Sequence, residues 1–374
     1  MTLETLPRGW WGYHWSPPHP RSILELIAAG SLDVELAALL WLLVEGRLPV
    51  IIAAGPPLAG KSTTLTALLD FLPSDTRPVY LGGWGEEFGW LPEASELGWR
   101  ADSPLRPPGA GSRPTDPAPS DVAVAPVHPG SSYLLAAELS DHLPVYTWGE
   151  RARVFLRAAS RGYGIGTTVH AESLAEVLAQ LAAPPVSLAE DELRWLGIVL
   201  VVGLVDATGR PLGFADLGDA ELGPFEPGLR RRIVAAHYLR PPERDAGGHV
   251  QRRPPAVLAT WDPRTDGFAH FAWGVTAELA ERVRRTPAAF EREQARRAAA
   301  LTDLVRRGET KPSAVAVALR AVADSDPPGA RLAPSGRAAA HLGHDHPGSP
   351  QVVATPSTAA LPAEPVPADP STRH

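Results

Sequence analysis

Two glycines, a lysine and a hydroxyl group follow one another at a fixed spacing in residues 55–62, which read GPPLAGKS. Glycine at positions 55 and 60 gives the backbone the freedom to curl its N–H groups around an anion. A helix that starts near Lys61 adds the positive end of its dipole to the charge of that lysine, and Ser62 supplies an oxygen for Mg²⁺. The segment therefore predicts a P-loop that binds the phosphates of a nucleoside triphosphate together with Mg²⁺.

The sequence around this loop has the form that a P-loop requires, a strand before it and a helix after it. Residues 48–54 read LPVIIAA, which is short and apolar, and residues 61–72 form a helical pattern that ends at Pro73. Lysine is rare, because among 35 Lys and Arg residues only Lys61 and Lys311 are lysines. A compact ammonium at position 61 suits a site that the broad fork of arginine does not fit. The residues predicted to contact the phosphates are Gly55, Pro56, Pro57, Leu58, Ala59, Gly60, Lys61, Ser62 and Thr63.

Hydrolysis of a nucleotide also requires a carboxylate that orients the attacking water. Residues 133–138 read YLLAAE, an apolar strand that ends in Glu138, which we predict to be the catalytic base, with Asp141 as the weaker alternative. His170 ends another predicted strand, and polar groups at this edge of a parallel sheet face the ligand crevice. From there His170 can sense the γ-phosphate by hydrogen bonding, although position alone favours a structural histidine.

These side chains need a sheet that brings the ends of strands together. Strands are predicted at residues 48–54, 78–81, 133–137, 166–170 and 198–205, and helices at residues 22–29, 32–44, 61–72, 150–160 and 174–181. Strands that alternate with helices indicate an α/β fold with a mainly parallel sheet. The pattern then changes to an antiparallel β element and a strongly helical, arginine-rich stretch, predicted at 231–238, 256–261, 268–273 and 276–307.

Composition divides the chain into four parts. A Trp- and Pro-rich segment, residues 1–21, precedes a nucleotide-binding domain at 22–229, which contains a Pro/Gly-rich insertion at about 101–130. Residues 230–310 form a smaller C-terminal part of strands and helices. The Pro/Ala-rich residues 311–374 are predicted to be a disordered tail.

Charge and hydropathy limit which partners and which cellular compartment are expected for the chain. The net charge is −7 without a long basic block, so nucleic acid is not an expected partner. The chain has no cysteine, which excludes disulfides and thiolate metal sites. No apolar run approaches the roughly 20 residues that span a bilayer. With no export signal visible either, we expect a cytoplasmic protein that can dock peripherally at the inner face of the cell membrane.

Read in order, four stretches resemble the secretion ATPases of type II and type IV secretion, type IV pili, Tad pili and archaella, in particular their archaeal and Tad-like branch. Residues 22–73 are similar to the helix pair, strand and Walker A motif, and residues 134–139, LLAAEL, to the Walker B motif. Residues 162–185, with His170 at the signature histidine, are similar to the His box. Residues 260–268, followed by the arginine-rich helix, are similar to the C-terminal part.

The resemblance implies a RecA-like P-loop NTPase core that hydrolyses Mg-ATP in an oligomeric ring, expected to be a hexamer. Such a ring drives an integral membrane platform protein for secretion or pilus assembly. In this family pattern Lys61 and Ser62 contact the phosphates and Mg²⁺, Glu138 activates water, and His170 acts as the sensor.

The sequence also departs from the family pattern. Gly82 and Gly83 stand where the family has an acidic box, with Glu86 or Glu87 as candidate substitutes, and no arginine follows Glu138. The family's N-terminal domain is expected to be missing or short. These departures favour one alternative, a degenerate, non-hydrolysing ATP-binding subunit that joins a ring of active paralogues.

Another alternative is a P-loop kinase or a further type of NTPase. Its lid would be the insertion, whose candidate arginines are Arg100, Arg106 and Arg113.

Overall fold

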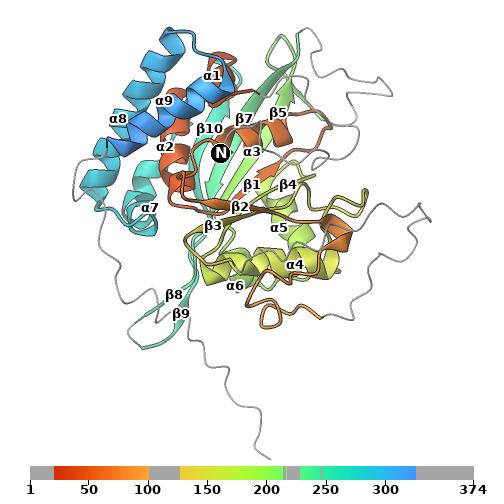
Figure 1. The fold of residues 1–374 in the computed structure, drawn as a ribbon. Helices are drawn as coiled ribbons and strands as arrows, with labels where there is room; N and C mark the ends of the chain where they lie inside the picture. The colour runs from red at the N-terminus through yellow and green to blue at the C-terminus, as the bar shows by residue number, and fades with distance from the viewer. Residues whose placement is uncertain (1–20, 101–126, 214–215, 217–227, 246, 326–374) are drawn as a thin grey trace, which may run out of the picture. The chain divides into compact units, whose positions relative to one another are not determined.

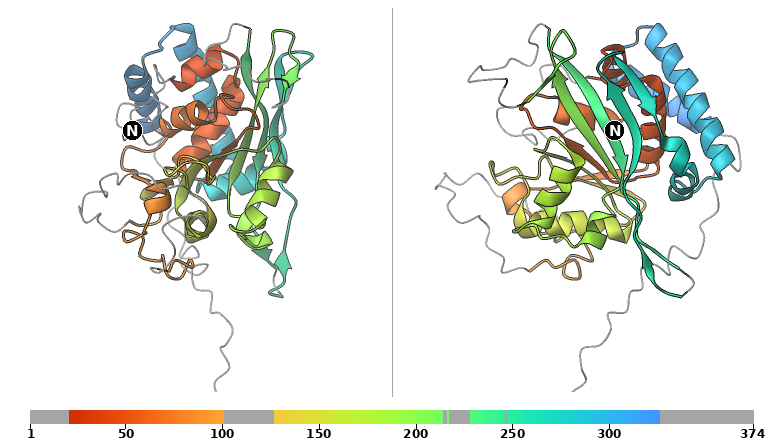
Figure 2. Two further views of the ribbon diagram at one scale, coloured as in Figure 1. Left: turned by 90° about the vertical axis from the view of Figure 1, so that its right-hand side faces the viewer. Right: turned by 180° about the vertical axis from the view of Figure 1, so that it is seen from behind.

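The computed structural model describes residues 21–100, 127–213, 216, 228–245 and 247–325 of the chain. Contacts divide the chain into two compact units, Met1–Ala333 and Pro334–His374, and every described residue belongs to the first unit. Figures 1 and 2 show the arrangement of helices and strands in this first unit.

Within the described residues, nine strands form one sheet: β1 Val50–Ala53, β2 Arg77–Tyr80, β3 Ser132–Leu135, β4 Gly164–Val169, β5 Ile198–Val205, β6 Pro211–Leu212, β7 Arg230–Tyr238, β10 Ala256–Asp262 and β11 Gly267–His270. Five parallel strands lie in the order β5-β1-β4-β3-β2, so β1 has a parallel neighbour on each side. Beyond β5, the antiparallel strands β7, β10 and β11 continue the sheet to its edge, and β6 pairs with β5.

A separate two-stranded hairpin, β8 Glu243–Arg244 and β9 Val250–Gln251, projects away from the main sheet (Figure 2). The helices of the described residues are α1 Ile23–Ala28, α2 Val34–Glu45, α3 Lys61–Leu69, α4 Gly149–Arg157, α5 Leu174–Ala182, α6 Glu190–Leu193, α7 Thr276–Arg282, α8 Pro287–Arg306 and α9 Pro312–Asp324.

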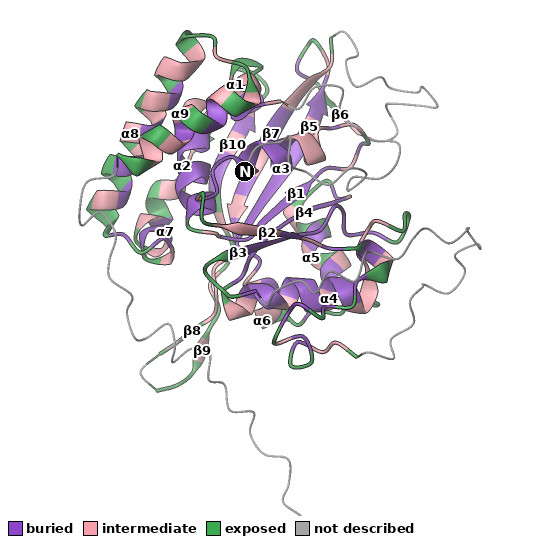
Figure 3. Cartoon of the chain, in the orientation of Figure 1, coloured by how far each residue is buried: buried purple, intermediate pink, exposed green. Residues whose placement is uncertain are grey.

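Both faces of the sheet are covered by helices, and side chains alternate between the faces along each strand. Val50 and Ile52 belong to an apolar cluster with residues of α1, α2, α3, α7, α8 and α9, whereas Ile51 and Ala53 belong to a second cluster with residues of α4, α5 and α6. Figure 3 shows the central strands buried between these layers. Burial on both faces explains why β1 and β5 are continuous apolar runs rather than alternating patterns.

The two helices before β1 are set by local signals and by burial. Ser22 caps α1 in a reciprocal arrangement with Glu25, and Asp33 caps α2 by accepting a hydrogen bond from the N–H of Leu36 at 2.9 Å. Residues 36–45 of α2 are all buried, as expected for a helix that is apolar on all sides. These helices therefore form part of the core that supports β1.

The predicted α/β class with a mostly parallel sheet is confirmed. The strand predicted at residues 198–205 coincides with β5, and the other parallel strands lie close to their predicted positions. The antiparallel strands expected after residue 230 are also present. They extend the main sheet by pairing β7 with β5, rather than forming an element of their own.

Two expectations for the C-terminal part need correction. The helical stretch at 276–307 is two helices, because Arg284 has a left-handed φ of 58° and Thr286 caps a new helix that begins with Pro287. The tail predicted to be disordered from residue 311 instead begins with α9, because Val315 and Leu319 bury their side chains in the core. The Pro/Ala-rich composition concealed this amphipathic spacing.

Three predicted parts fall wholly or mostly outside the described residues: the segment 1–20, residues 101–126 of the insertion, and residues 326–374 of the tail. In the part of the chain that the structure describes, no helix is long and apolar enough to cross a membrane.

Candidate functional site

The loop at residues 54–60 joins β1 to α3, in the strand–loop–helix context that its motif predicts. Gly60 is the N-cap of α3 with a left-handed φ of 97°, and the N–H groups of the first helical turn receive no side-chain cap. Gly55 is closely packed, since a Cβ at this position would lie 2.2 Å from Cγ of Glu172. The left-handed φ of Gly60 favours glycine at that position, and a side chain at position 55 would displace the exposed side chain of Glu172. The start of α3 presents backbone donors suited to an anion.

Three polar side chains meet beside this loop. Lys61 is the first residue of α3, Glu138 follows β3, and His170 follows β4. Nζ of Lys61 lies 3.8 Å from Oε2 of Glu138, and 3.1 and 3.2 Å from the two ring nitrogens of His170. The distance from Oε1 of Glu138 to Nε2 of His170 is 3.4 Å, which closes the triangle. The structure therefore brings together the lysine, carboxylate and histidine that the sequence singled out.

The order of the strands explains why these residues meet. Since β4 lies between β1 and β3, the segments that follow the three strands emerge at one edge of the parallel sheet. After β3 the chain stays beside β4, because the N–H of Leu139 donates to the carbonyl of Thr168 at 2.8 Å. The carbonyl of His170 accepts a hydrogen bond from Nε2 of Gln180 at 2.7 Å. Nδ1 of the His170 ring lies 3.3 Å from the carbonyl oxygen of Gly55.

Burial sets the electrostatics of this triangle. Lys61 and Glu138 are each 7% exposed. Burial lowers the pKa of Lys61 to about 8, and the charge and hydrogen bonding of Glu138 oppose this shift. Burial and the positive charge of Lys61 lower the pKa of His170, and Glu138 again opposes the change. At neutral pH Lys61 is therefore charged and His170 neutral, so one ring nitrogen can accept a hydrogen bond from Lys61.

The structure distinguishes Glu138 from its sequence alternative, Asp141. The Asp141 side chain is 54% exposed, and its ion-pair partner among the described residues is His142, 3.9 Å away. Glu138 is the carboxylate that faces Lys61. A buried carboxylate beside a cation at a strand edge is placed to accept a proton from a ligand in the same site.

Glu86, a candidate substitute for the acidic box, forms hydrogen bonds within its own loop. Its buried carboxylate accepts hydrogen bonds from the N–H groups of Gly82 and Phe88, at 2.9 and 2.8 Å, and from Nε1 of Trp90 at 3.0 Å. The carboxylate thus holds together the loop that follows β2. Glu87, the other candidate, is exposed.

The fold brings two further residues to the loop that sequence reasoning missed. Glu172 packs against Gly55, and Arg231, on β7, donates from Nε to the carbonyl of Leu58 at 2.9 Å. The sequence contained a signal for Arg231. Three consecutive arginines, residues 230–232, stand at the start of the strand predicted at 231–238, and alternation along a strand sends the middle side chain to the face opposite its two neighbours.

Ser62, the predicted Mg²⁺ ligand, and Thr63 lie partly exposed in the first turn of α3. The hydroxyl of Ser62 is a hard oxygen ligand of the kind that Mg²⁺ prefers. No group of three or more His, Asp or Glu side chains in the described ranges is placed to hold a metal ion. Ser62 could supply one hydroxyl ligand to a Mg²⁺ ion whose other ligands would be phosphate oxygens and water.

No protein-family model matches the chain. The uncharacterized protein MJ1287 of Methanocaldococcus jannaschii is 25% identical over 179 residues, which cover 47% of this chain and 59% of that protein. The uncharacterized protein MJ0900 of the same organism is 23% identical over 247 residues, which cover 66% of this chain and 38% of that protein. The chain is thus similar to two archaeal proteins, and it spans less than two thirds of the length of either one.

Proposed function

We propose that this chain is a P-loop ATPase with a RecA-like core, which works as the motor ATPase of a secretion or pilus-assembly machine and hydrolyses Mg-ATP in an oligomeric ring. The observation that carries the proposal is the contact of Lys61 with Glu138 and His170 beside the glycine-rich loop. The hexameric ring, the integral membrane platform as partner and the cytoplasmic position rest on the family resemblance alone.

The residues of the site divide the work of hydrolysis among them. The N–H groups at the start of α3 and the ammonium of Lys61 bind the β- and γ-phosphates, and Ser62 holds Mg²⁺, which neutralises charge on the phosphates. Glu138 orients the attacking water and accepts its proton. His170 contacts both Lys61 and Glu138, and from this position a hydrogen bond to the γ-phosphate would make it the sensor.

The topology supports the RecA-like core. In the sheet β4 lies between β1, which leads into the glycine-rich loop, and β3, which leads to Glu138. His170 follows β4 and contacts both Lys61 and Glu138. The alternative of a P-loop kinase depends on a lid in the insertion at about 101–130. Residues 101–126 of it, with the candidate arginines Arg106 and Arg113, lie outside the described residues, whereas Arg100 lies within them.

A second candidate function, a non-hydrolysing ATP-binding subunit of such a machine, is favoured by one observation. The carboxylate of Glu86 is used within its own loop, so it does not replace the acidic box expected after β2. This alternative retains the phosphate-binding loop and lacks turnover.

The purified protein is expected to bind Mg-ATP and to release phosphate, and Lys61→Ala is expected to weaken ATP binding by about 10- to 100-fold, the contribution of charge-assisted hydrogen bonds. Binding is measured with a fluorescent ATP analogue, and turnover by phosphate release. Lys311→Ala is the matched control, because the only other lysine of the sequence is exposed next to α9.

Each outcome of this experiment selects one function. Binding and turnover that are both lost in Lys61→Ala, with Lys311→Ala unchanged, support the motor ATPase. Binding without turnover in the wild-type protein selects the non-hydrolysing subunit. A wild-type protein that binds no nucleotide contradicts both functions.

The affinity for ATP is expected to fall as pH rises above about 8, because the pKa of Lys61 in the free site is about 8. The negative phosphates favour the charged ammonium, so the pKa of Lys61 is higher in the complex with ATP than in the free protein. At a pH between these two pKa values, ATP binding takes up a proton. Below pH 8 Lys61 is already charged and this effect vanishes, whereas above it the affinity decreases by at most about tenfold per pH unit. Calorimetry in buffers of different ionisation enthalpy measures the uptake. Equal uptake at pH 7.5 and pH 9 would contradict the prediction.

A further inference from the structure

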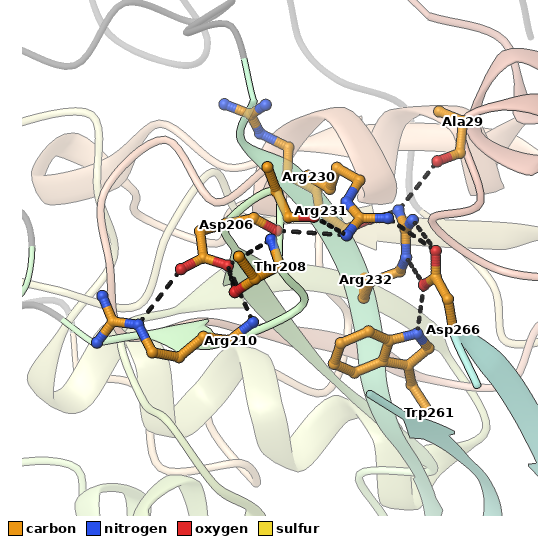
Figure 4. A network of polar contacts seen from close by, with 10 residues as sticks. Ala29, Asp206, Thr208, Arg210, Arg230, Arg231, Arg232, Trp261 and Asp266 are labelled. Carbon is orange, nitrogen blue, oxygen red and sulfur yellow. Dashed lines mark hydrogen bonds and ion pairs between the residues drawn. The ribbon is translucent and has the colours of Figure 1, made fainter. Parts of the chain in front are cut away.

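Three consecutive arginines open β7, and the structure uses them in two ways. Side chains alternate along a strand, so Arg230 and Arg232 share one face, and Arg231 lies on the other. Figure 4 shows Arg230 and Arg232 converging on Asp266, with Arg231 directed away from that carboxylate.

The two outer arginines share one carboxylate within the fold, that of Asp266. Arg232 donates from Nε and Nη2 to the two oxygens of Asp266 at 2.9 and 3.0 Å, and Nη1 of Arg230 lies 2.9 Å from the same carboxylate. Nε1 of Trp261 also donates to it at 2.9 Å. Hydrogen bonding by Arg232 is the largest of the effects that lower the pKa of Asp266 to about 2. Arg232 further donates from Nη1 to the carbonyl of Ala29, which ties β7 to the end of α1.

Arg231 is directed to the phosphate-binding loop instead. Its Nε donates to the carbonyl of Leu58 at 2.9 Å, and its Cδ lies 3.2 Å from the position that a Cβ on Gly60 would take. Leu58 has a left-handed φ of 58°, a conformation in which a non-glycine residue needs support, and the hydrogen bond supplies it. The guanidinium therefore both packs against the loop and fixes its backbone.

The charge of Arg231 has no carboxylate to balance it among the described residues, in contrast to its two neighbours. Burial lowers the pKa of Arg231, and the like charge of Arg21 adds to this effect. A half-buried cation beside a second cation is relieved when an anion binds next to it. The nearest structure that is built for an anion is the loop that Arg231 already contacts.

We propose that Arg231 contacts the phosphate chain of the nucleotide bound at this loop. Its Nε–H group holds the loop at Leu58, and its terminal nitrogens donate to phosphate oxygens, a geometry for which the planar guanidinium is suited. The inference rests on the proposed function and deepens it, because it adds to Lys61 a second cation from the same chain.

The test compares Arg231→Gln with Arg230→Gln, a matched control from the same strand whose partner Asp266 keeps its contacts with Arg232. The dissociation constants of Mg-ATP and of inorganic tripolyphosphate are measured for both variants and for the wild-type protein. We expect Arg231→Gln to lower the affinity for both ligands by about tenfold or more, which corresponds to the loss of one charge-assisted hydrogen bond. Arg230→Gln is expected to bind both as the wild type does. Arg231→Lys, which keeps the charge but not the fork, is expected to restore part of the tripolyphosphate affinity.

The outcomes separate this inference from the proposed function. If the wild-type protein binds ATP and Lys61→Ala does not, but Arg231→Gln binds tripolyphosphate normally, the inference fails and the proposed function stands. Equal losses in Arg231→Gln and Arg230→Gln also overturn it, because they indicate general damage to β7, which the thermal unfolding midpoints would reveal. If the wild-type protein binds neither ligand, the proposed function fails first.

Discussion

Replacing Glu138 with glutamine is expected to lower the rate of phosphate release from Mg-ATP by about 100- to 10,000-fold, the range that positioned acid–base groups contribute. Glutamine has the shape of glutamate, but it cannot accept the proton of the attacking water. Because Lys61 and the start of α3 remain in place, the affinity for ATP is expected to change far less than the rate. Phosphate release at saturating ATP, together with a direct binding measurement, tests both halves of the expectation.

Asp141→Asn is the control for this experiment. Asp141 lies in the same connection as Glu138, but its side chain is 54% exposed and is paired with His142 rather than with Lys61. We expect this variant to turn over ATP at nearly the wild-type rate. A loss of turnover in Asp141→Asn with normal activity in Glu138→Gln would transfer the role of base to Asp141. No turnover above the variants in the wild-type protein would favour the non-hydrolysing subunit.

The parts of this site that could be predicted from the sequence depend on local signals. The apolar run before Gly55 and the helical pattern after Gly60 place the loop between β1 and α3, as the structure confirms. Glu138 and His170 each follow a predicted strand, and polar residues after parallel strands gather at one sheet edge whatever the details of the loops. The contact of both with Lys61 therefore follows from the α/β class once the strand order is known.

The parts that could not be predicted depend on contacts between segments far apart in the chain. Arg231 reaches Leu58 because β7 pairs antiparallel with β5, and no local pattern specifies that pairing. The same pairing makes the C-terminal strands an extension of the main sheet. Helix α9 was hidden for a related reason, since Val315 and Leu319 acquire a partner surface only in the assembled core.

A buried arginine joins α8 to α2 and illustrates the same limit. The side chain of Arg297 is fully buried and pairs with the carboxylates of Glu45 and Glu293, the latter through Nε at 2.9 Å. Its guanidinium also lies 4.7 Å from the centre of the Trp41 ring. Both carboxylates are buried as well. In the sequence Arg297 is one of many arginines in a helical stretch, and only the fold gives it two acidic partners.

Replacing Arg297 with methionine is expected to lower the free energy of unfolding by about 3–5 kcal/mol, the cost of removing one partner from a buried ion pair. Methionine fills much of the same volume, so the loss arises from the carboxylates of Glu45 and Glu293, which remain buried without this cation. Glu293 keeps its ion pair with Arg296. Urea denaturation gives the difference, provided that the dependence on urea concentration is the same in both proteins.

Arg306→Met provides the comparison, because Arg306 lies on the same helix with its side chain 72% exposed and is paired only with Asp303 at 3.4 Å among the described residues. It is expected to cost at most about 1 kcal/mol. Adding Glu45→Leu to Arg297→Met should recover part of the loss, since a buried carboxylate that has lost the cation of Arg297 is removed. Equal costs for the two arginine variants would show that the buried charges do not depend on each other.

Since the network lies between α2 and α8, away from the loop at Gly55, folded Arg297→Met protein should bind ATP with wild-type affinity. A loss of affinity in the folded variant would instead mean that the packing of α2 on α8 controls the conformation of the loop.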